Sequence, residues 1–80
     1  MEIRERDHYL CQWCLKRKNK LTHERLSVHH IVPIEEDEAL SFEDENLITL
    51  CDVDHEEAEK GNIEREVLKE IAKANIPPGF

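Results

Sequence analysis

The stretch Val28-His29-His30-Ile31-Val32-Pro33-Ile34 places two adjacent histidines inside an apolar, largely β-branched run that includes a proline. Such a run favours a β-strand, and Pro33 should end the strand or leave it at a sheet edge. Neighbouring side chains of a strand point to opposite faces of the sheet. One histidine can therefore face a metal while the other faces a substrate, and a twist or a bulge would bring both to a common site.

A second apolar run, Leu47-Ile48-Thr49-Leu50, follows after a long connection. Residues 28–32 and 47–50 together predict an antiparallel hairpin with a long loop. Four consecutive acids occupy 35–38 in that loop, and because consecutive carboxylates do not converge on one cation we expect a solvated segment. Residues 41–44 resemble a capping box and predict a single helical turn before Asn46.

Short helices are predicted before and after this hairpin. Residues 2–10 should form the first, and Thr22 should cap a helical turn over 23–26. The segment 51–55 leads into a helix that runs through Lys60.

The end of the chain predicts one more helix and a tail. Gly61 interrupts the chain and Asn62 should cap the last helix, whose apolar face consists of residues at helical spacing: Ile63, Val67, Leu68, Ile71 and Ala74. The proline-containing segment 77–80 cannot continue a helix. These elements predict an α+β fold in which residues 1–76 form a single domain and residues 77–80 a tail.

The composition is that of a small domain with a thin core. Eighty residues, only four of them aromatic, usually need a metal or a disulfide for stability. No apolar run is long enough to cross a membrane, and the first residues lack the apolar core of a signal peptide. We therefore expect a cytoplasmic protein without a membrane partner, in which reduced cysteines more often bind metal than form disulfides.

The net charge of −8 argues against broad, nonspecific DNA binding. The charge is unevenly distributed, because residues 1–25 carry seven Lys/Arg against four acids, while residues 26–80 carry four against fifteen. A basic edge on an acidic body can contact phosphates locally. The candidates for phosphate contact on DNA are Lys16, Arg17, Lys18 and Arg25.

The three cysteines favour a metal site. Cys11-x-x-Cys14 alone is compatible with a redox pair, but a thioredoxin-like motif needs a βαβ context that is not visible here. Half of a zinc knuckle is the better interpretation, because Cys51 returns directly after the second predicted strand.

This order of motifs resembles the HNH endonuclease family, with its ββα-metal fold, over roughly residues 6–60. The small free-standing members found in phage and bacterial genomes are the most similar in size and pattern. The matching residues are Arg6-Asp7, Cys11-x-x-Cys14, the double-histidine strand through Pro33, Asn46-Leu-Ile-Thr-Leu-Cys51, and His55.

The resemblance implies a role for each matching residue. His30 would be the general base, and His29 and His55 would bind the catalytic divalent ion, which is Mg²⁺, Mn²⁺, Ni²⁺ or Zn²⁺. Asn46 would hold the loop and position His30 through hydrogen bonds. The three cysteines would bind a structural zinc. Glu59 lies one helical turn after His55, where some relatives have a further ligand, but an exposed helix carboxylate is the simpler interpretation.

One residue departs from the family pattern. Zinc-bearing relatives close the knuckle with a second CxxC motif, and Asp54 stands at the place of its last cysteine. Aspartate can ligate zinc, which would make a Cys3Asp site. Alternatively, water, His8 or His23 supplies the fourth ligand, or the zinc site is degenerate. Asp54 also suits the N-terminus of a helix, which favours acidic groups.

The chemistry of phosphodiester hydrolysis calls for the same residue types. It needs a base near neutral pH and a cation at the phosphate, which imidazole and a bound metal provide. We therefore predict a metal-dependent endonuclease that nicks or cleaves DNA, with a larger targeting or packaging protein as a second partner. The alternatives are a non-catalytic, zinc-supported nucleic-acid-binding module and an acidic protein-interaction domain.

Overall fold

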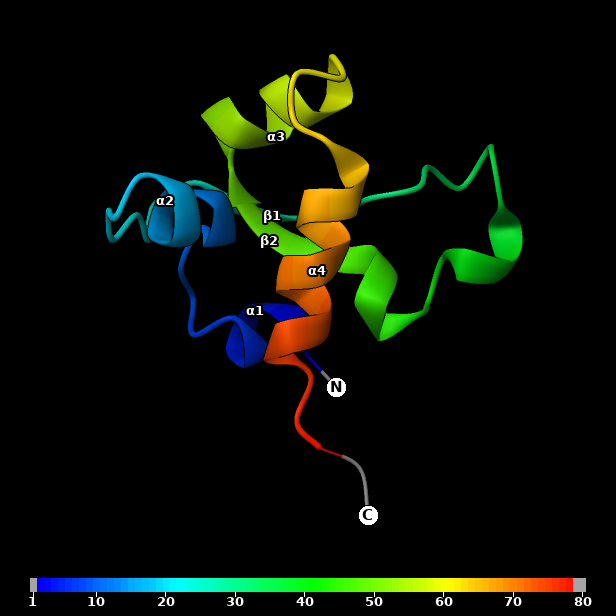
Figure 1. The fold of residues 1–80 in the computed structure, drawn as a ribbon, viewed down its shortest axis with the longest axis horizontal. Coiled ribbons are helices and arrows are strands. Elements are labelled where there is room, and N and C mark those ends of the chain that lie inside the picture. Colours follow the sequence, from blue (N-terminus) through cyan, green and yellow to red (C-terminus); the bar gives the residue numbers. More distant parts are fainter. Residues whose placement is uncertain (1, 79–80) are drawn as a thin grey trace.

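The computed structural model describes residues 2–78, so positions 79 and 80 of the predicted tail lie outside the described residues. Its centre is an antiparallel hairpin of β1 (Leu26–His30) and β2 (Leu47–Cys51), in which His29 is opposite Ile48. Figure 1 shows α3 (Asp52–Glu59) and α4 (Arg65–Asn75) beside this hairpin, and α1 (Ile3–Arg6) and α2 (Gln12–Arg17) on its other sides. The predicted α+β architecture with a hairpin, an N-terminal helix and a C-terminal helix is confirmed.

The second strand is the middle of the core. Ile48, Thr49 and Leu50 are fully buried, so both faces of β2 are covered by other elements. From α4, the apolar face buries Leu68 and Ala72 against this strand region. Because β2 is enclosed, it is a rigid support for β1, which carries both adjacent histidines.

The first strand is shifted relative to the prediction of 28–32. It begins at Leu26 and ends at His30 because the next backbone groups bond to Asn46. The amide of Ile31 donates to the Asn46 backbone carbonyl at 2.8 Å, and the amide of Val32 donates to its side-chain Oδ1 at 2.8 Å.

The predicted helix over residues 2–10 is wrong beyond Arg6. Asp7 is fully buried, and its carboxylate accepts two hydrogen bonds from Arg6 and one from the Thr49 amide at 2.9 Å. His8 and Tyr9 then adopt φ of 58° and 55°, which reverses the chain. The buried ion pair therefore ends the helix, because the chain must turn once Asp7 points inward.

Two predicted caps are also wrong. No helix follows Thr22: its carbonyl accepts a hydrogen bond from the Cys11 amide at 2.8 Å, and β1 begins at Leu26. Asn62 does not cap α4, which begins at Arg65, and its side chain instead donates to Glu57 at 2.9 Å.

The connection between the strands contains two short 3-10 turns, η1 (Glu38–Leu40) and η2 (Asp44–Asn46). The single turn predicted before Asn46 from residues 41–44 is displaced, because η2 begins at Asp44 and includes Asn46. The Ser41 hydroxyl does not cap that turn but donates to the Glu38 carbonyl at 2.8 Å, at the end of η1. Within residues 2–78 we find no helix with the length and apolar character needed to span a bilayer.

Candidate metal centres

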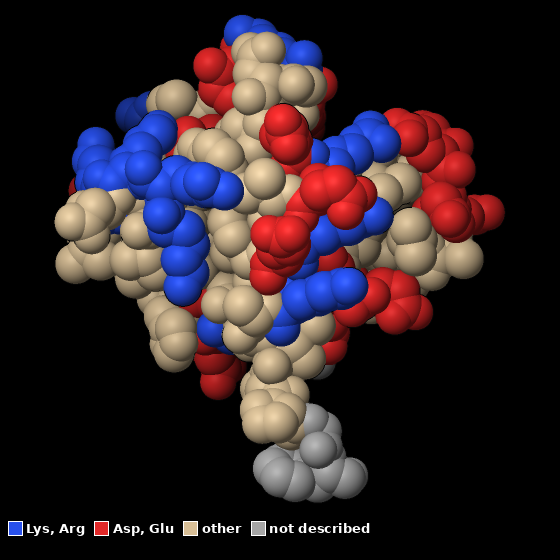
Figure 2. Space-filling model, viewed as in Figure 1, with Lys and Arg blue, Asp and Glu red and all other residues tan. Residues whose placement is uncertain are grey.

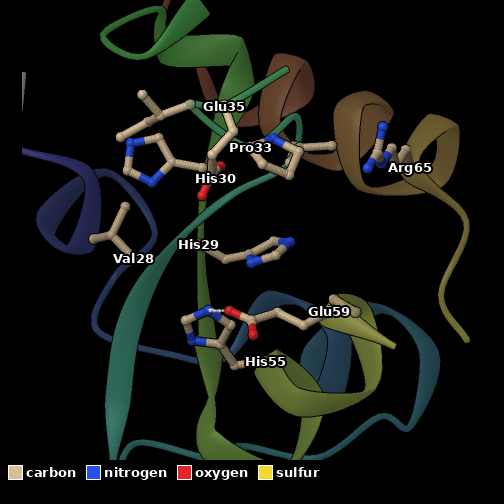
Figure 3. Close-up of a pocket in the computed structure, with 11 residues that line it drawn as sticks. Val28, His29, His30, Pro33, Glu35, His55, Glu59 and Arg65 are labelled. Atoms are coloured by element: carbon tan, nitrogen blue, oxygen red, sulfur yellow. Dashed lines mark ion pairs between the residues drawn. The ribbon is translucent and has the colours of Figure 1, made fainter. Parts of the chain in front are cut away.

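A pocket of about 480 Å³ opens between β1, α3 and the first turn of α4. Three histidines and a carboxylate line it, from the strand and from α3: His29, His30, His55 and Glu59. Figure 3 shows His29 above His55, with Glu59 reaching back toward the His55 ring. The sequence predicted the three histidines here, and the packing of α3 on β1 adds the carboxylate.

Three of these side chains converge on one point. The His29 and His55 ring centroids lie 4.8 Å apart, and His55 Nε2 lies 3.0 Å from Glu59 Oε1. One donor atom from each of the three residues falls within 4.8 Å of the others. Two imidazoles and a carboxylate can hold a divalent transition metal while leaving positions open for phosphate and water.

Ser27 fixes the orientation of the His55 ring. Its Oγ lies 2.6 Å from His55 Nδ1, and it shares the α3-facing side of β1 with His29. If the hydroxyl accepts a hydrogen bond from Nδ1–H, Nε2 is free to bind a metal on the side of His29 and Glu59. Second partners of this kind set the tautomer of metal-binding histidines.

His29 is held in the neutral form that binds metals. Its exposed fraction is only 7%. Burial, with a smaller contribution from nearby His55, lowers the pKa of His29 to about 4. The ring is therefore uncharged at neutral pH, so a cation does not have to displace a proton from it.

His30 points the other way from the strand, as alternation requires. Figure 3 shows its ring turned away from His29, on the side of Val28. It is half-buried and still lines the same pocket. His30 is therefore next to the candidate metal-binding group of His29, His55 and Glu59 without being part of it.

Asn46 is buried and organises the loop that follows β1. Its Nδ2 donates to the carbonyls of Val32 and Leu40, both at 3.1 Å, and its Oδ1 accepts the Val32 amide. Within residues 2–78 these side-chain bonds all go to backbone, and none of them is to His30. Asn46 thus fixes the chain two residues after His30 rather than contacting the ring.

A second cluster, the Cys3Asp group, lies on the other side of β2. It consists of Cys11, Cys14, Cys51 and Asp54, which are all buried and whose ligand atoms lie within 4.8 Å of one another. Asp54 Oδ2 lies 3.1, 3.0 and 3.4 Å from the three sulfurs in that order. Two sulfurs, of Cys14 and Cys51, are 4.0 Å apart.

These spacings are close to those around a tetrahedral zinc ion, although the oxygen lies nearer to the sulfurs of Cys11 and Cys14 than a bound ion would place it. With zinc–sulfur bonds of about 2.3 Å and a zinc–oxygen bond of about 2.0 Å, neighbouring sulfurs lie about 3.8 Å apart and sulfur and oxygen about 3.5 Å. Neither His8 nor His23 belongs to the cluster formed within residues 2–78, whereas Asp54 does. Among the possible fourth ligands considered from the sequence, the structure brings Asp54 to the three thiols.

The charges around this cluster are balanced by Lys18. Its Nζ lies 2.9 Å from Asp54 Oδ1, while Oδ2 faces the thiols. Burial alone would raise the pKa of Asp54, but hydrogen bonds from Cys14 and Lys18 hold that pKa below its ordinary value. Burial raises the pKa of the Cys11 thiol, so zinc binding must release thiol protons.

The predicted phosphate-contacting residues lie on and near α2. Figure 2 shows Lys and Arg side chains gathered on the left, over α2, and Asp and Glu gathered on the right, over the loop after β1. Lys18 is paired with Asp54, and Arg25 with Asp52 at 3.4 Å. The Arg17 guanidinium lies 5.5 Å from the centre of the Trp13 ring, and Lys16 is exposed.

Three polar residues lie at the two clusters although the sequence interpretation did not place them there: Glu59, Ser27 and Lys18. Glu59 had a usable signal, its position four residues after His55 on one helix face. Ser27 and Lys18 had none, because a serine in a strand and a lysine in a basic connector are ordinary features.

A hairpin and a helix that surround one point with two histidines and a carboxylate define a ββα-metal domain. A sequence model of the HNH endonuclease family matches residues 11–61, well over half of the chain, and the protein therefore belongs to this family. Members bind a metal and act on DNA, which indicates a nuclease-like or DNA-binding function. Comparison with curated proteins and with solved structures gave no match.

Proposed function

We propose that this protein is a metal-dependent endonuclease that hydrolyses phosphodiester bonds of DNA. The observation that carries the proposal is the convergence of His29, His55 and Glu59 in the pocket that His30 also lines. A purely structural metal site would not need an additional half-buried histidine beside open ligand positions. The family match supports the same substrate.

In the proposed mechanism, His30 accepts a proton from a water molecule as that water attacks phosphorus. His29, His55 and Glu59 would hold the divalent ion, and Ser27 keeps the His55 ring oriented. When bound, the ion supplies positive charge for the phosphate and for the departing oxygen. The bond from phosphorus to the 3′ oxygen breaks and that oxygen takes a proton from solvent water, which leaves a 5′ phosphate and a 3′ hydroxyl.

Asn46 has a supporting role in this proposal. By fixing the backbone at Val32 and Leu40 it holds the loop that forms one wall of the pocket. The position of His30 at the end of β1 then depends on a rigid backbone rather than on a contact to its ring.

We further propose that the Cys3Asp group binds a structural zinc. A thin core of this size gains stability from such a site, and the donor set and spacings suit zinc. The basic residues Lys16, Arg17 and Arg25 would contact DNA phosphates, with Lys18 divided between this role and Asp54. A larger protein that directs the domain to its DNA belongs to the same proposal.

The test is nicking of supercoiled plasmid by the purified protein with Mg²⁺, Mn²⁺ or Ni²⁺. We expect the His30→Ala variant to nick at least about 100-fold more slowly than the wild type, because general bases contribute roughly 10²–10⁴-fold. His23→Ala is the matched control, since His23 is exposed and does not line this pocket. Equal nicking by wild type and His30→Ala would refute the base assignment. DNA binding without nicking under any of these ions would favour the non-catalytic module.

A further inference from the structure

Arg65 is the one basic residue among the pocket-lining residues in the described part of the chain. It belongs to the first turn of α4, beyond the segment that matches the family, so no role is carried over to it. Figure 3 shows it to the right of the two metal-binding rings, with His30 to their left. A DNA strand that crosses the pocket past His30 and the metal-binding group would meet Arg65 on the far side.

The Arg65 guanidinium is held by a carboxylate of the acidic loop. Nη1 donates to Glu36 Oε1 at 2.9 Å and Nη2 donates to Oε2 at 2.8 Å, a bidentate pair. Both side chains are about half exposed, at 49% and 52%. An exposed ion pair of this kind contributes little to stability, so another anion can displace the carboxylate.

Glu36 occupies the place that a phosphate would take. Two oxygens of a phosphodiester present the same spacing to a guanidinium fork as the two oxygens of a carboxylate. The hydrogen bond from Arg65 holds the pKa of Glu36 below its ordinary value, so Glu36 remains an anion near neutral pH.

The pocket needs this positive charge. Besides the metal-binding group it is lined by Glu35, and its surroundings repel DNA unless the charge is offset.

We propose that Arg65 binds a phosphate of the DNA strand that enters the pocket, and that Glu36 occupies the guanidinium until DNA displaces it. This inference rests on the proposed nuclease function. The ligand is a phosphodiester group, and the recognition does not depend on the base sequence.

The experiment measures binding of a short end-labelled DNA duplex by fluorescence anisotropy in Ca²⁺ buffer at a series of KCl concentrations. Glu36→Gln should tighten binding roughly fivefold, because it frees Arg65. Arg65→Gln should weaken binding roughly fivefold and reduce the salt slope by about one.

Glu56→Gln and Lys60→Gln are the matched controls. Glu56 and Lys60 form an exposed ion pair on and next to α3, at 3.1 Å, with neither residue lining the pocket. Glu56→Gln changes the net charge by the same amount as Glu36→Gln, and Lys60→Gln by the same amount as Arg65→Gln. The two controls therefore report the general electrostatic effect. In an Arg65→Gln background, Glu36→Gln should tighten binding no more than Glu56→Gln does. Circular dichroism of each variant checks that the fold is intact.

Equal effects of Glu36→Gln and Glu56→Gln, or a Glu36→Gln gain that survives in the Arg65→Gln background, would overturn the inference. Plasmid nicking by the wild type separates this failure from failure of the proposed function. A wild type that nicks while Arg65→Gln binds DNA normally refutes only the role of Arg65. A wild type that neither nicks nor binds DNA refutes both.

Discussion

Substituting Asp7 by Asn removes a buried charge while keeping an oxygen that can accept the hydrogen bond from the Thr49 amide. In the wild type the exposed side-chain fractions of Arg6 and Asp7 are 1% and 0%, and Arg6 Nε lies 2.8 Å from Asp7 Oδ1. The variant leaves the Arg6 guanidinium buried without a counter-charge, which costs about 3–5 kcal/mol. A domain of 80 residues has a free energy of unfolding of about 4–12 kcal/mol, so the loss is a large part of the total.

Urea denaturation followed by circular dichroism measures this loss. With a denaturant slope near 1.5 kcal/mol per molar, we expect Asp7→Asn to lower the midpoint by about 2–3 M. Arg4→Gln is the control, because the Arg4–Glu2 pair is about half exposed and should contribute little to stability. If both variants shift the midpoint by the same amount, the buried pair does not hold α1 to β2 as described.

Three further outcomes are expected. In metal-free protein, the free energy of unfolding should fall as pH falls from about 6.5 to about 4. In this range His29 binds a proton in the unfolded chain but not in the folded protein, where burial lowers its pKa. Urea midpoints of the wild type in EDTA that stay flat over this range would contradict this. Asp54→Ala should lose the mass of zinc in native mass spectrometry and lower the melting temperature, whereas Asp54→Cys should keep both; full zinc occupancy in Asp54→Ala would show that the carboxylate is not a ligand. Asn46→Ala removes three hydrogen bonds to loop backbone and should cost about 2–3 kcal/mol in urea denaturation, with faster proteolysis of the loop; a loss below about 0.5 kcal/mol would mean that the loop is held by other contacts.

The hairpin and its histidines were predictable because their signals are local. Two β-branched runs separated by a polar connection predict paired strands, and the family resemblance placed His29 and His55 near one point. The three cysteines were also predicted to meet, from their spacing and order.

Features that depend on tertiary packing were not predictable. Asp7 reads as an ordinary helix residue until the chain turns it inward toward β2. Glu59 lies one helical turn after His55 on α3, but only the packing of that helix on β1 brings the two side chains to His29. Arg65 and Glu36 lie 29 positions apart, and nothing in either segment indicates their pairing.

The charge distribution was likewise predictable only in part. The excess of basic residues near the N-terminus was visible in the sequence, and Figure 2 places it over α2. The sequence did not show that Lys18 would turn toward Asp54, because that contact requires α2 and α3 to meet around the cysteines.

The central claim is that His29, His55 and Glu59 hold one divalent ion in the pocket that His30 lines. A crystal of the protein grown with Mn²⁺ tests it through the anomalous difference map. The account predicts a manganese peak at bonding distance from both imidazoles. A map with both rings ordered and no peak between them at saturating Mn²⁺ would contradict it.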